Sequence, residues 1–178
     1  MSGSHGGIRI LVLGLSGSGK TCLLKNLKPS AKIDPGLTLG HNVEWIKLKD
    51  MHYIIWDVSG RTELQQFIWK LYERDVPILW WCISANDSQE RIRESANALG
   101  NFMRDIKSVT HFVLVTTTEQ NKTSSSEGFI NETFRDCLLA LRGRGLMVSR
   151  TRYNTQGSRN DLKPLFPDIN ERHFTARL

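Results

Sequence analysis

Cysteine is scarce in this sequence, and the cysteines that occur lie far apart. The chain has three, Cys22, Cys82 and Cys137, and no two are close enough to form a metal-binding motif. The odd count argues against a complete disulfide framework. Metal-ligand spacing is also missing among His5, His52, His111 and His173. We therefore expect reduced thiols and no cysteine or histidine metal site.

Long hydrophobic runs are missing as well. The longest strong one, PILWWCI at 77–83, is far shorter than the roughly 20 residues that cross a bilayer. We interpret it as a buried strand. The N-terminus, MSGSHGG, is small and polar and lacks the apolar core of a secretory signal. These absences predict a cytoplasmic protein, with residues 1–7 a flexible N-terminus or the remnant of a cloning tag.

Acidic residues are fewer than basic ones, 18 against 24, so the formal net charge is +6 at pH 7. Such a balance suits an anionic membrane surface, nucleic acid or an acidic partner. The densest basic segment, 142–159, has few aromatic side chains, whereas single-stranded nucleic acids are bound largely by stacking on aromatics. We expect a solvated basic face and no nucleic-acid partner.

Apolar runs and helical periods alternate through the chain. The patterns predict strands at 8–15, 43–48, 52–58, 78–83, 111–116 and 146–151, and helices from residue 21 and at 63–72, 89–103 and 129–141. This alternation predicts one α/β domain with a six-stranded, mostly parallel sheet, helices on both faces, and ligands at the carboxyl ends of the strands.

The strand at 43–48 is apolar on both sides. Val43 and Trp45 point to one face, and Ile46 and Leu48 to the other. We therefore expect this strand to be covered on both faces. The short turn after it predicts a hairpin with the strand at 52–58.

A phosphate-binding loop follows the first strand. GLSGSGKT, Gly14 to Thr21, fits the P-loop pattern without a mismatch, between an apolar strand and an amphipathic helix. Its backbone N–H groups and the helix N-terminus would hold the phosphates of a nucleotide. Lys20 would neutralise the β- and γ-phosphates, and the Thr21 hydroxyl would bind Mg²⁺. The predicted phosphate-binding residues are Gly14, Ser16, Gly17, Ser18, Gly19, Lys20, Thr21 and Cys22.

Several further motifs, in order and at nearly constant spacing, resemble the Arf and Arf-like family of small GTPases. TLGHNVE at 38–44 is similar to the family's first switch, and WDVSGR at 56–61 to its Trp-Asp-Val-Gly-Gly-Gln motif. WKLY at 69–72 and ANDSQERI at 85–92 match the segments beyond it, and the likeness fades past residue 115. The resemblance implies the P-loop NTPase fold of a small GTPase over residues 8–178.

The resemblance also implies roles for individual residues. Thr38 and Asp57 would join Thr21 around Mg²⁺, and the Gly60 N–H would bond the γ-phosphate. The strand pair at 43–58 would be the interswitch hairpin, whose aromatic effector surface would hold His41, Trp56 and Tyr72. Effectors, and an exchange factor or a GTPase-activating protein, are the implied partners.

Two departures from the family pattern lie in the second switch. Arg61 stands where the family has the glutamine that orients the attacking water. A guanidinium has only donors, so it cannot accept a hydrogen bond from that water. We expect slow or absent intrinsic hydrolysis and assign no catalytic residue. Ser59 replaces a glycine and would narrow the motion of this segment.

The base-recognition motif also departs from the family. The family's Asn-Lys-x-Asp is best matched by TEQN, with Thr118 at the first position, Glu119 in place of lysine and Asn121 in place of aspartate. An amide at Asn121 suits xanthine better than guanine, because it presents a donor as well as an acceptor. A slipped alignment, NKTS, also lacks the aspartate. YNTQG at 153–157 stands where the family has Cys-Ala-Thr-Ser-Gly.

Two functional interpretations stay open. The first is an Arf-like switch that binds GTP or GDP with Mg²⁺, recruits effectors in membrane trafficking and hydrolyses slowly. The alternative is a pseudo-GTPase that keeps the fold and the effector face but has weak or altered nucleotide specificity. Ser2 follows Met1, so the Met-Gly myristoylation pattern is absent from this chain. Peripheral association with an intracellular membrane stays possible by other means.

Overall fold

The computed structural model describes residues 7–28, 41–48, 50–61, 69, 75–104, 106–120, 122–157, 162 and 164–166. Its elements, in chain order, are β1 (Ile8–Leu13), α1 (Lys20–Leu27), β2 (His41–Leu48), β3 (Met51–Val58), β4 (Ile78–Ser84), α3 (Gln89–Phe102), β5 (His111–Thr118), α4 (Glu127–Gly143) and β6 (Met147–Asn154). Thr38, Tyr72, Asn121, residues 1–6 and most of the helix predicted at 63–72 lie outside the described residues.

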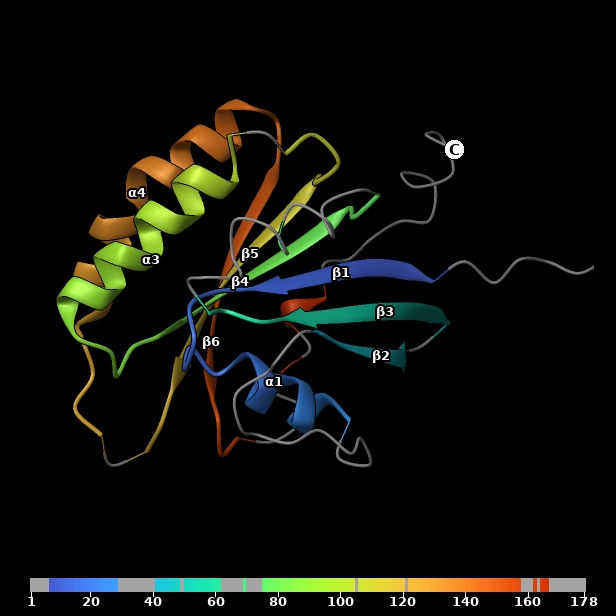
Figure 1. The fold of residues 1–178 in the computed structure, drawn as a ribbon, viewed down its shortest axis with the longest axis horizontal. Helices are drawn as coiled ribbons and strands as arrows, with labels where there is room; N and C mark the ends of the chain where they lie inside the picture. Colours follow the sequence, from blue (N-terminus) through green and yellow to red (C-terminus); the bar gives the residue numbers. More distant parts are fainter. Residues whose placement is uncertain are drawn as a thin grey trace, which may run out of the picture.

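The strands form one six-stranded sheet in the order β2-β3-β1-β4-β5-β6 (Figure 1). Strand β2 runs antiparallel to β3, and every other neighbouring pair is parallel. The predicted fold class, a mostly parallel α/β sheet of the small-GTPase type, is confirmed. Because β1, β4, β5 and β6 are parallel, the loops after them emerge at one edge of the sheet, where α/β proteins bind ligands.

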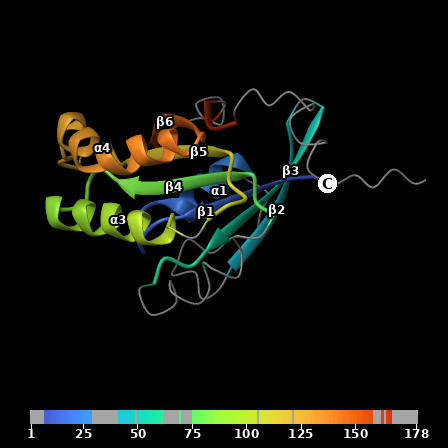
Figure 2. The same cartoon turned by 90° about the horizontal axis from the view of Figure 1, so that it is seen from above.

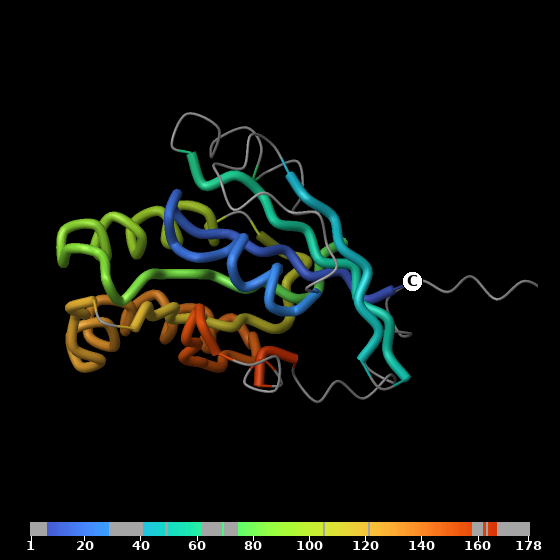
Figure 3. The backbone as a smooth tube through the Cα atoms, turned by 90° about the horizontal axis from the view of Figure 1, so that it is seen from below, coloured from blue at the N-terminus to red at the C-terminus, as the bar shows by residue number. Residues whose placement is uncertain are grey.

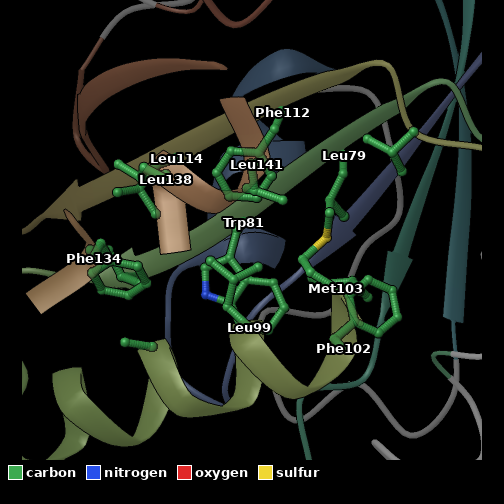
Figure 4. Packing of buried hydrophobic residues seen from close by; sticks show 14 of the residues in the cluster. Leu79, Trp81, Leu99, Phe102, Met103, Phe112, Leu114, Phe134, Leu138 and Leu141 are labelled. Atoms are coloured by element: carbon green, nitrogen blue, oxygen red, sulfur yellow. The ribbon is translucent and has the colours of Figure 1, made fainter. Parts of the chain in front are cut away.

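Helices cover both faces of this sheet, as predicted. Helices α3 and α4 pack side by side on one face, and α1 lies on the other (Figure 2). The neighbouring residues Trp80 and Trp81, both fully buried in β4, point to opposite faces. Trp81 lies among Leu99, Phe102 and other side chains of α3 and α4 (Figure 4).

Serine caps begin both long helices at the positions that local chemistry favours. The Ser88 hydroxyl accepts a hydrogen bond from the Arg91 N–H at the start of α3, and Ser126 accepts one from Phe129 at the start of α4. The first turn of α3 lies close to the phosphate-binding loop, because Arg91 in this turn donates to the Ser16 carbonyl oxygen. None of the helices in the described ranges is both long and apolar enough to cross a membrane.

The expectation that β2 is covered on both faces is wrong. Ile46 is buried, but Val43 is 37% exposed and Trp45 58% exposed. The reason is topological: β2 is the edge strand, whereas α3 and α4 pack on β4 and β6. Figure 3 shows the hairpin of β2 and β3 lying apart from both helices. In this edge strand, apolar side chains occur on both faces but only one face is covered. The face with Val43 and Trp45 is open to solvent.

Candidate functional site

The P-loop joins β1 to α1 and has the backbone geometry of a phosphate cradle. Gly14 has φ 143° and Gly19 has φ 83°, a region that side-chain-bearing residues rarely adopt. A Cβ at Gly14 would lie 2.2 Å from the Cys82 carbonyl oxygen, and one at Gly19 would lie 2.8 Å from the Thr117 Oγ1. Both glycines are therefore required by packing as well as by conformation.

Lys20 is the buried cation of the loop. Its Nζ donates to the Gly14 and Leu15 carbonyl oxygens at 2.9 and 2.8 Å, and to Ser18 Oγ at 3.3 Å. Burial lowers the pKa of Lys20, and the negative charge of Asp57 opposes this shift. An ammonium held against carbonyl oxygens in a buried site is well placed to meet phosphate oxygens, which neutralise its charge more fully.

Thr21 and Asp57 bring two oxygen ligands together from α1 and β3. Thr21 Oγ1 donates to Asp57 Oδ2 at 2.9 Å, while the buried Oδ1 has no hydrogen bond of ordinary geometry within the described residues. Burial raises the pKa of Asp57, opposed by the charge of Lys20 and by side-chain hydrogen bonds from Thr21 and Asn42. A buried carboxylate oxygen beside a hydroxyl fits Mg²⁺, which binds oxygen ligands and keeps several waters.

The raised pKa of Asp57 predicts how stability depends on pH. The folded state holds this proton more tightly than the unfolded state does, so in metal-free protein the free energy of unfolding should fall as pH rises through the folded pKa. Asp57→Asn removes the titrating group. Its free energy of unfolding relative to the wild type should therefore increase as the pH rises above 3.8, the ordinary pKa of an aspartate. Urea unfolding at a series of pH values measures this.

The matched control is Asp50→Asn, which changes an exposed aspartate in the turn between β2 and β3. Its stability curve should run parallel to that of the wild type. If the curve of unfolding free energy against pH for Asp57→Asn also ran parallel to that of the wild type, the raised pKa of Asp57 would be contradicted.

The segment after β3 packs directly on the P-loop. The Ser16 N–H donates to the Gly60 carbonyl oxygen at 2.9 Å. A Cβ at Gly60 would lie 2.3 Å from the Gly14 carbonyl oxygen, so only glycine fits here. Ser59, the second departure from the family pattern, is buried, and its carbonyl oxygen accepts from Trp69 Nε1 at 3.0 Å.

These groups line a cavity of about 560 Å³ at the carboxyl edge of the sheet. This volume lies in the range of small-molecule sites. The described lining residues are Ser16, Gly17, Gly19, Lys20, Thr21, Cys22, Ser59, Gly60, Arg61, Ser84, Thr117, Glu119, Thr155 and Gln156. Most of the predicted phosphate-binding residues thus meet in one cavity with Gly60 and Arg61.

At the end of β5, Thr117 and Thr118 make different contacts. Thr117, rather than Thr118, reaches the P-loop, with its Oγ1 3.0 Å from the Ser18 carbonyl oxygen. Thr118 Oγ1 instead donates to the Tyr153 carbonyl oxygen at 3.4 Å, on β6. Sequence reasoning missed Thr117, Thr155 and Gln156 as lining residues. Only the match of YNTQG to a family motif pointed toward the last two.

Comparison with known proteins decides the family. The model of the ADP-ribosylation factor family matches residues 1–161. The chain belongs to this family. Among solved structures it is similar to the Arl6 BBS3 small GTPase of Trypanosoma brucei with the bound nucleotide analogue GppNp, with a TM-score of 0.69, 15% identity, and coverage of 90% of this chain and 95% of that one. It is also similar to the mammalian SRP receptor, with a TM-score of 0.69, 15% identity, and coverage of 88% and 95%.

The hairpin carries two of the aromatic residues that the family resemblance assigns to effectors. His41 and Trp56 stack with ring centroids 6.0 Å apart and an interplanar angle of 20°. His41 is exposed and Trp56 half-buried. Val43 and Trp45 continue the same face of β2 toward the hairpin turn. In this Arf-family chain the apolar face therefore contains Val43 and Trp45 in addition to His41 and Trp56 of the predicted set.

Arg91 is a site residue that the sequence did not single out. Its guanidinium donates to the Ser16 carbonyl oxygen at 2.6 Å, across 75 positions of the chain. Asp87 and Glu94 lie 3.7 Å from the same side chain. In a trans peptide the carbonyl and the next N–H point in opposite directions. By holding the Ser16 carbonyl, Arg91 fixes the direction of the Gly17 N–H in the phosphate cradle.

Proposed function

We propose that this Arf-family protein is a nucleotide-dependent switch that binds GTP or GDP with Mg²⁺ and recruits effectors, with slow or absent intrinsic hydrolysis. One observation carries the proposal. Lys20, the Thr21–Asp57 pair and Gly60 line or adjoin one cavity, and Gly60 is hydrogen-bonded to the P-loop at Ser16. A phosphate placed on the loop would therefore act directly on the segment that begins the second switch.

The positions of these groups support the proposed contacts to phosphate and metal. The residues 14 and 16–22 would hold the phosphates, with Lys20 as their counter-charge. Thr21 and Asp57 would hold Mg²⁺, which supplies further positive charge to the phosphates. Thr38, Thr118 and Asn121 stay in the proposal on the family resemblance.

Slow hydrolysis follows from Arg61, which lines the cavity close to Gly60. Its backbone N–H lies 3.4 Å from Ser59 Oγ. The guanidinium offers donors and no acceptor, so it can attract phosphate charge but cannot orient water for attack. The GTP-bound state would then persist until a partner supplies the missing group or exchanges the nucleotide.

The output of the switch would be effector binding on the hairpin face with His41 and Trp56. Switch segments of this kind are ordered by contacts to the γ-phosphate and released without it. We place this role in membrane trafficking, in the cytoplasm and peripherally at an intracellular membrane, in line with the family.

The test is calorimetric titration of nucleotide-stripped protein with GTP, GDP and XTP in Mg²⁺, followed by single-turnover hydrolysis. Tight binding of GTP and GDP that requires Mg²⁺, with negligible turnover, is the expected result. Absence of binding to all three would favour the alternative, a pseudo-GTPase scaffold.

Arg61→Gln, which restores a hydrogen-bond acceptor, is expected to raise the rate of single-turnover GTP hydrolysis. An unchanged rate would contradict the explanation given for slow hydrolysis.

Arg91 provides a prediction about nucleotide release. Arg91→Ala removes the hydrogen bond that fixes the Ser16 peptide, so GTP should dissociate roughly fivefold to tenfold faster, consistent with a partly exposed charged hydrogen bond of about 1–1.5 kcal/mol. Stopped-flow displacement of a fluorescent GTP analogue measures the rate. Arg93→Ala is the control, because Arg93 lies on the same helix but packs on the Phe129 ring at 5.0 Å. Equal rates in both variants would refute the role of Arg91.

A further inference from the structure

A second cavity lies between α4 and the edge strand β6, away from the cavity at the P-loop. Its volume is about 340 Å³, and the two cavities share no lining residue. Arg135, Arg142 and Arg150 line it. The only acidic residue in its described lining is Glu132. The cavity therefore has a net positive charge that the proposed switch does not use.

The three arginines come from two elements that pack together. Arg135 and Arg142 lie about two helical turns apart on α4 and therefore on the same face of the helix. Arg150 belongs to β6, and its guanidinium donates to the side-chain oxygen of Asn131 on α4. This hydrogen bond holds Arg150 against the helix. The fold thus gathers side chains from separate parts of the chain around one cavity.

The charge of these arginines is only partly neutralised within the protein. Arg135 lies 3.3 Å from Asp136, but both side chains are exposed, so this ion pair contributes little. In the part of the chain that the structure describes, no carboxylate forms an ion pair with Arg142 or Arg150. Asn131 accepts from Arg150 as a neutral amide and leaves its charge in place. The cavity is therefore complementary to an anion.

The type of cation indicates the class of anion. All the basic residues of this cavity are arginines, and the basic segment 142–159 contains no lysine. A guanidinium is a planar fork of donors that binds two oxygens of a phosphate or a carboxylate at once, whereas a lysine acts as a point charge. The cavity therefore suits groups with several anionic oxygens, such as phospholipid headgroups.

An exposed leucine in the same cavity favours a membrane over a dissolved anion. Leu139 is 55% exposed, whereas the preceding Leu138 is buried in the core. At a membrane surface the headgroups would bind the guanidiniums, and the boundary of the acyl chains would accept Leu139. A dissolved polyanion would bind the arginines but leave Leu139 in water. The combination of arginines with an exposed leucine therefore fits a membrane surface better.

The place of this cavity in the fold leaves the rest of the switch accessible. β6 is one edge of the sheet and β2 is the other, so the cavity and the hairpin face with His41 and Trp56 lie at opposite edges (Figure 2). A membrane bound at the β6 edge would leave that hairpin face free for a partner. The net charge of +6 favours the approach of the whole molecule to an anionic surface.

We propose that α4 and β6 form a docking surface for membranes that contain anionic phospholipids, with the three arginines at the headgroups and Leu139 in the apolar interface. The proposal goes beyond the function proposed above, which names no residue for membrane contact. It does not depend on nucleotide binding, because the two cavities share no residue.

The experiment is co-sedimentation of the full chain with vesicles of phosphatidylcholine, with and without phosphatidylserine, over a range of salt concentrations. Wild type should bind only the vesicles with phosphatidylserine, and more weakly as salt rises, because salt screens exposed charges. Arg142→Gln and Arg150→Gln should each bind about fivefold more weakly, the effect of one arginine near an anionic surface. Leu139→Gln should bind at least about threefold more weakly with an unchanged salt dependence, because it removes apolar contact and no charge.

The matched control is Arg9→Gln, which removes an exposed arginine from β1, in the middle of the sheet. It should bind vesicles like wild type. Thermal unfolding and GTP titration of every variant should also match wild type, because each altered side chain is exposed and lies outside the P-loop cavity.

Three results would overturn the proposal. Wild type that binds neither kind of vesicle would exclude membrane docking and leave an acidic protein as the candidate partner of the arginines. Arginine variants at 142 and 150 that bind vesicles as tightly as Arg9→Gln would show that the overall charge, and not this surface, attracts the membrane. Wild-type binding by Leu139→Gln would remove the leucine from the interface and leave only an adsorbed charge. None of these results would affect the nucleotide switch, which the GTP titration tests separately.

Discussion

Lys20→Ala is expected to weaken GTP binding at least about a hundredfold, and GDP binding by less, because GDP lacks the γ-phosphate. The wild-type ammonium is buried at the phosphate cradle, where its charge is screened less than at the protein surface. Charge-assisted hydrogen bonds to two phosphate groups, at about 1.5–3 kcal/mol each, account for a loss of this size. Calorimetric titration in Mg²⁺ measures both affinities.

The control for this variant is Lys25→Ala, which removes a lysine from the same helix outside the cavity lining. A second variant, Lys20→Gln, separates charge from shape, because it keeps a donor for the Gly14 and Leu15 carbonyl oxygens but carries no charge. It should bind as poorly as Lys20→Ala. Wild-type affinity in Lys20→Gln would show that the lysine shapes the loop rather than neutralising phosphate.

The phosphate end was predictable from sequence because its signals are local. A strand, a glycine-rich loop and a helix follow one another within 20 residues, and each glycine has a backbone reason. The buried strand β4 was predictable for a similar reason, since a continuous apolar run predicts cover on both faces. The structure confirms this prediction, because every residue of β4 is buried.

The failures concern contacts between distant segments. The alternation in β2 predicts two apolar faces, but exposure of Val43 and Trp45 depends on which strand lies at the edge of the sheet. The turn around Glu119 has no periodicity, and its geometry depends on Asn86, 33 positions away. Arg91 is typical of a helix surface in sequence, and only the folded chain brings it to Ser16.

Gly60→Ala is expected to uncouple the second switch from the P-loop. The added methyl carbon would lie 2.3 Å from the Gly14 carbonyl oxygen and 2.6 Å from the Ser16 nitrogen, and neither backbone atom can move without distorting the phosphate cradle. The segment must instead shift away and lose the hydrogen bond from the Ser16 N–H. Overpacking of this kind lowers the free energy of unfolding by about 1–3 kcal/mol.

Urea unfolding with and without nucleotide separates the stability effect from the signalling effect. In the wild type, saturating GTP should stabilise more than GDP, because the γ-phosphate adds contacts through Gly60 to the folded state. In Gly60→Ala the two nucleotides should stabilise equally, since the displaced segment no longer contacts the γ-phosphate. The control is Gly143→Ala at the end of α4, where an added Cβ meets nothing within 4 Å. A Gly60→Ala protein that kept both its free energy of unfolding and the larger stabilisation by GTP than by GDP would contradict this prediction. That result would show that the second switch does not sense the phosphate, and the proposed switch would lack its link to the effector face.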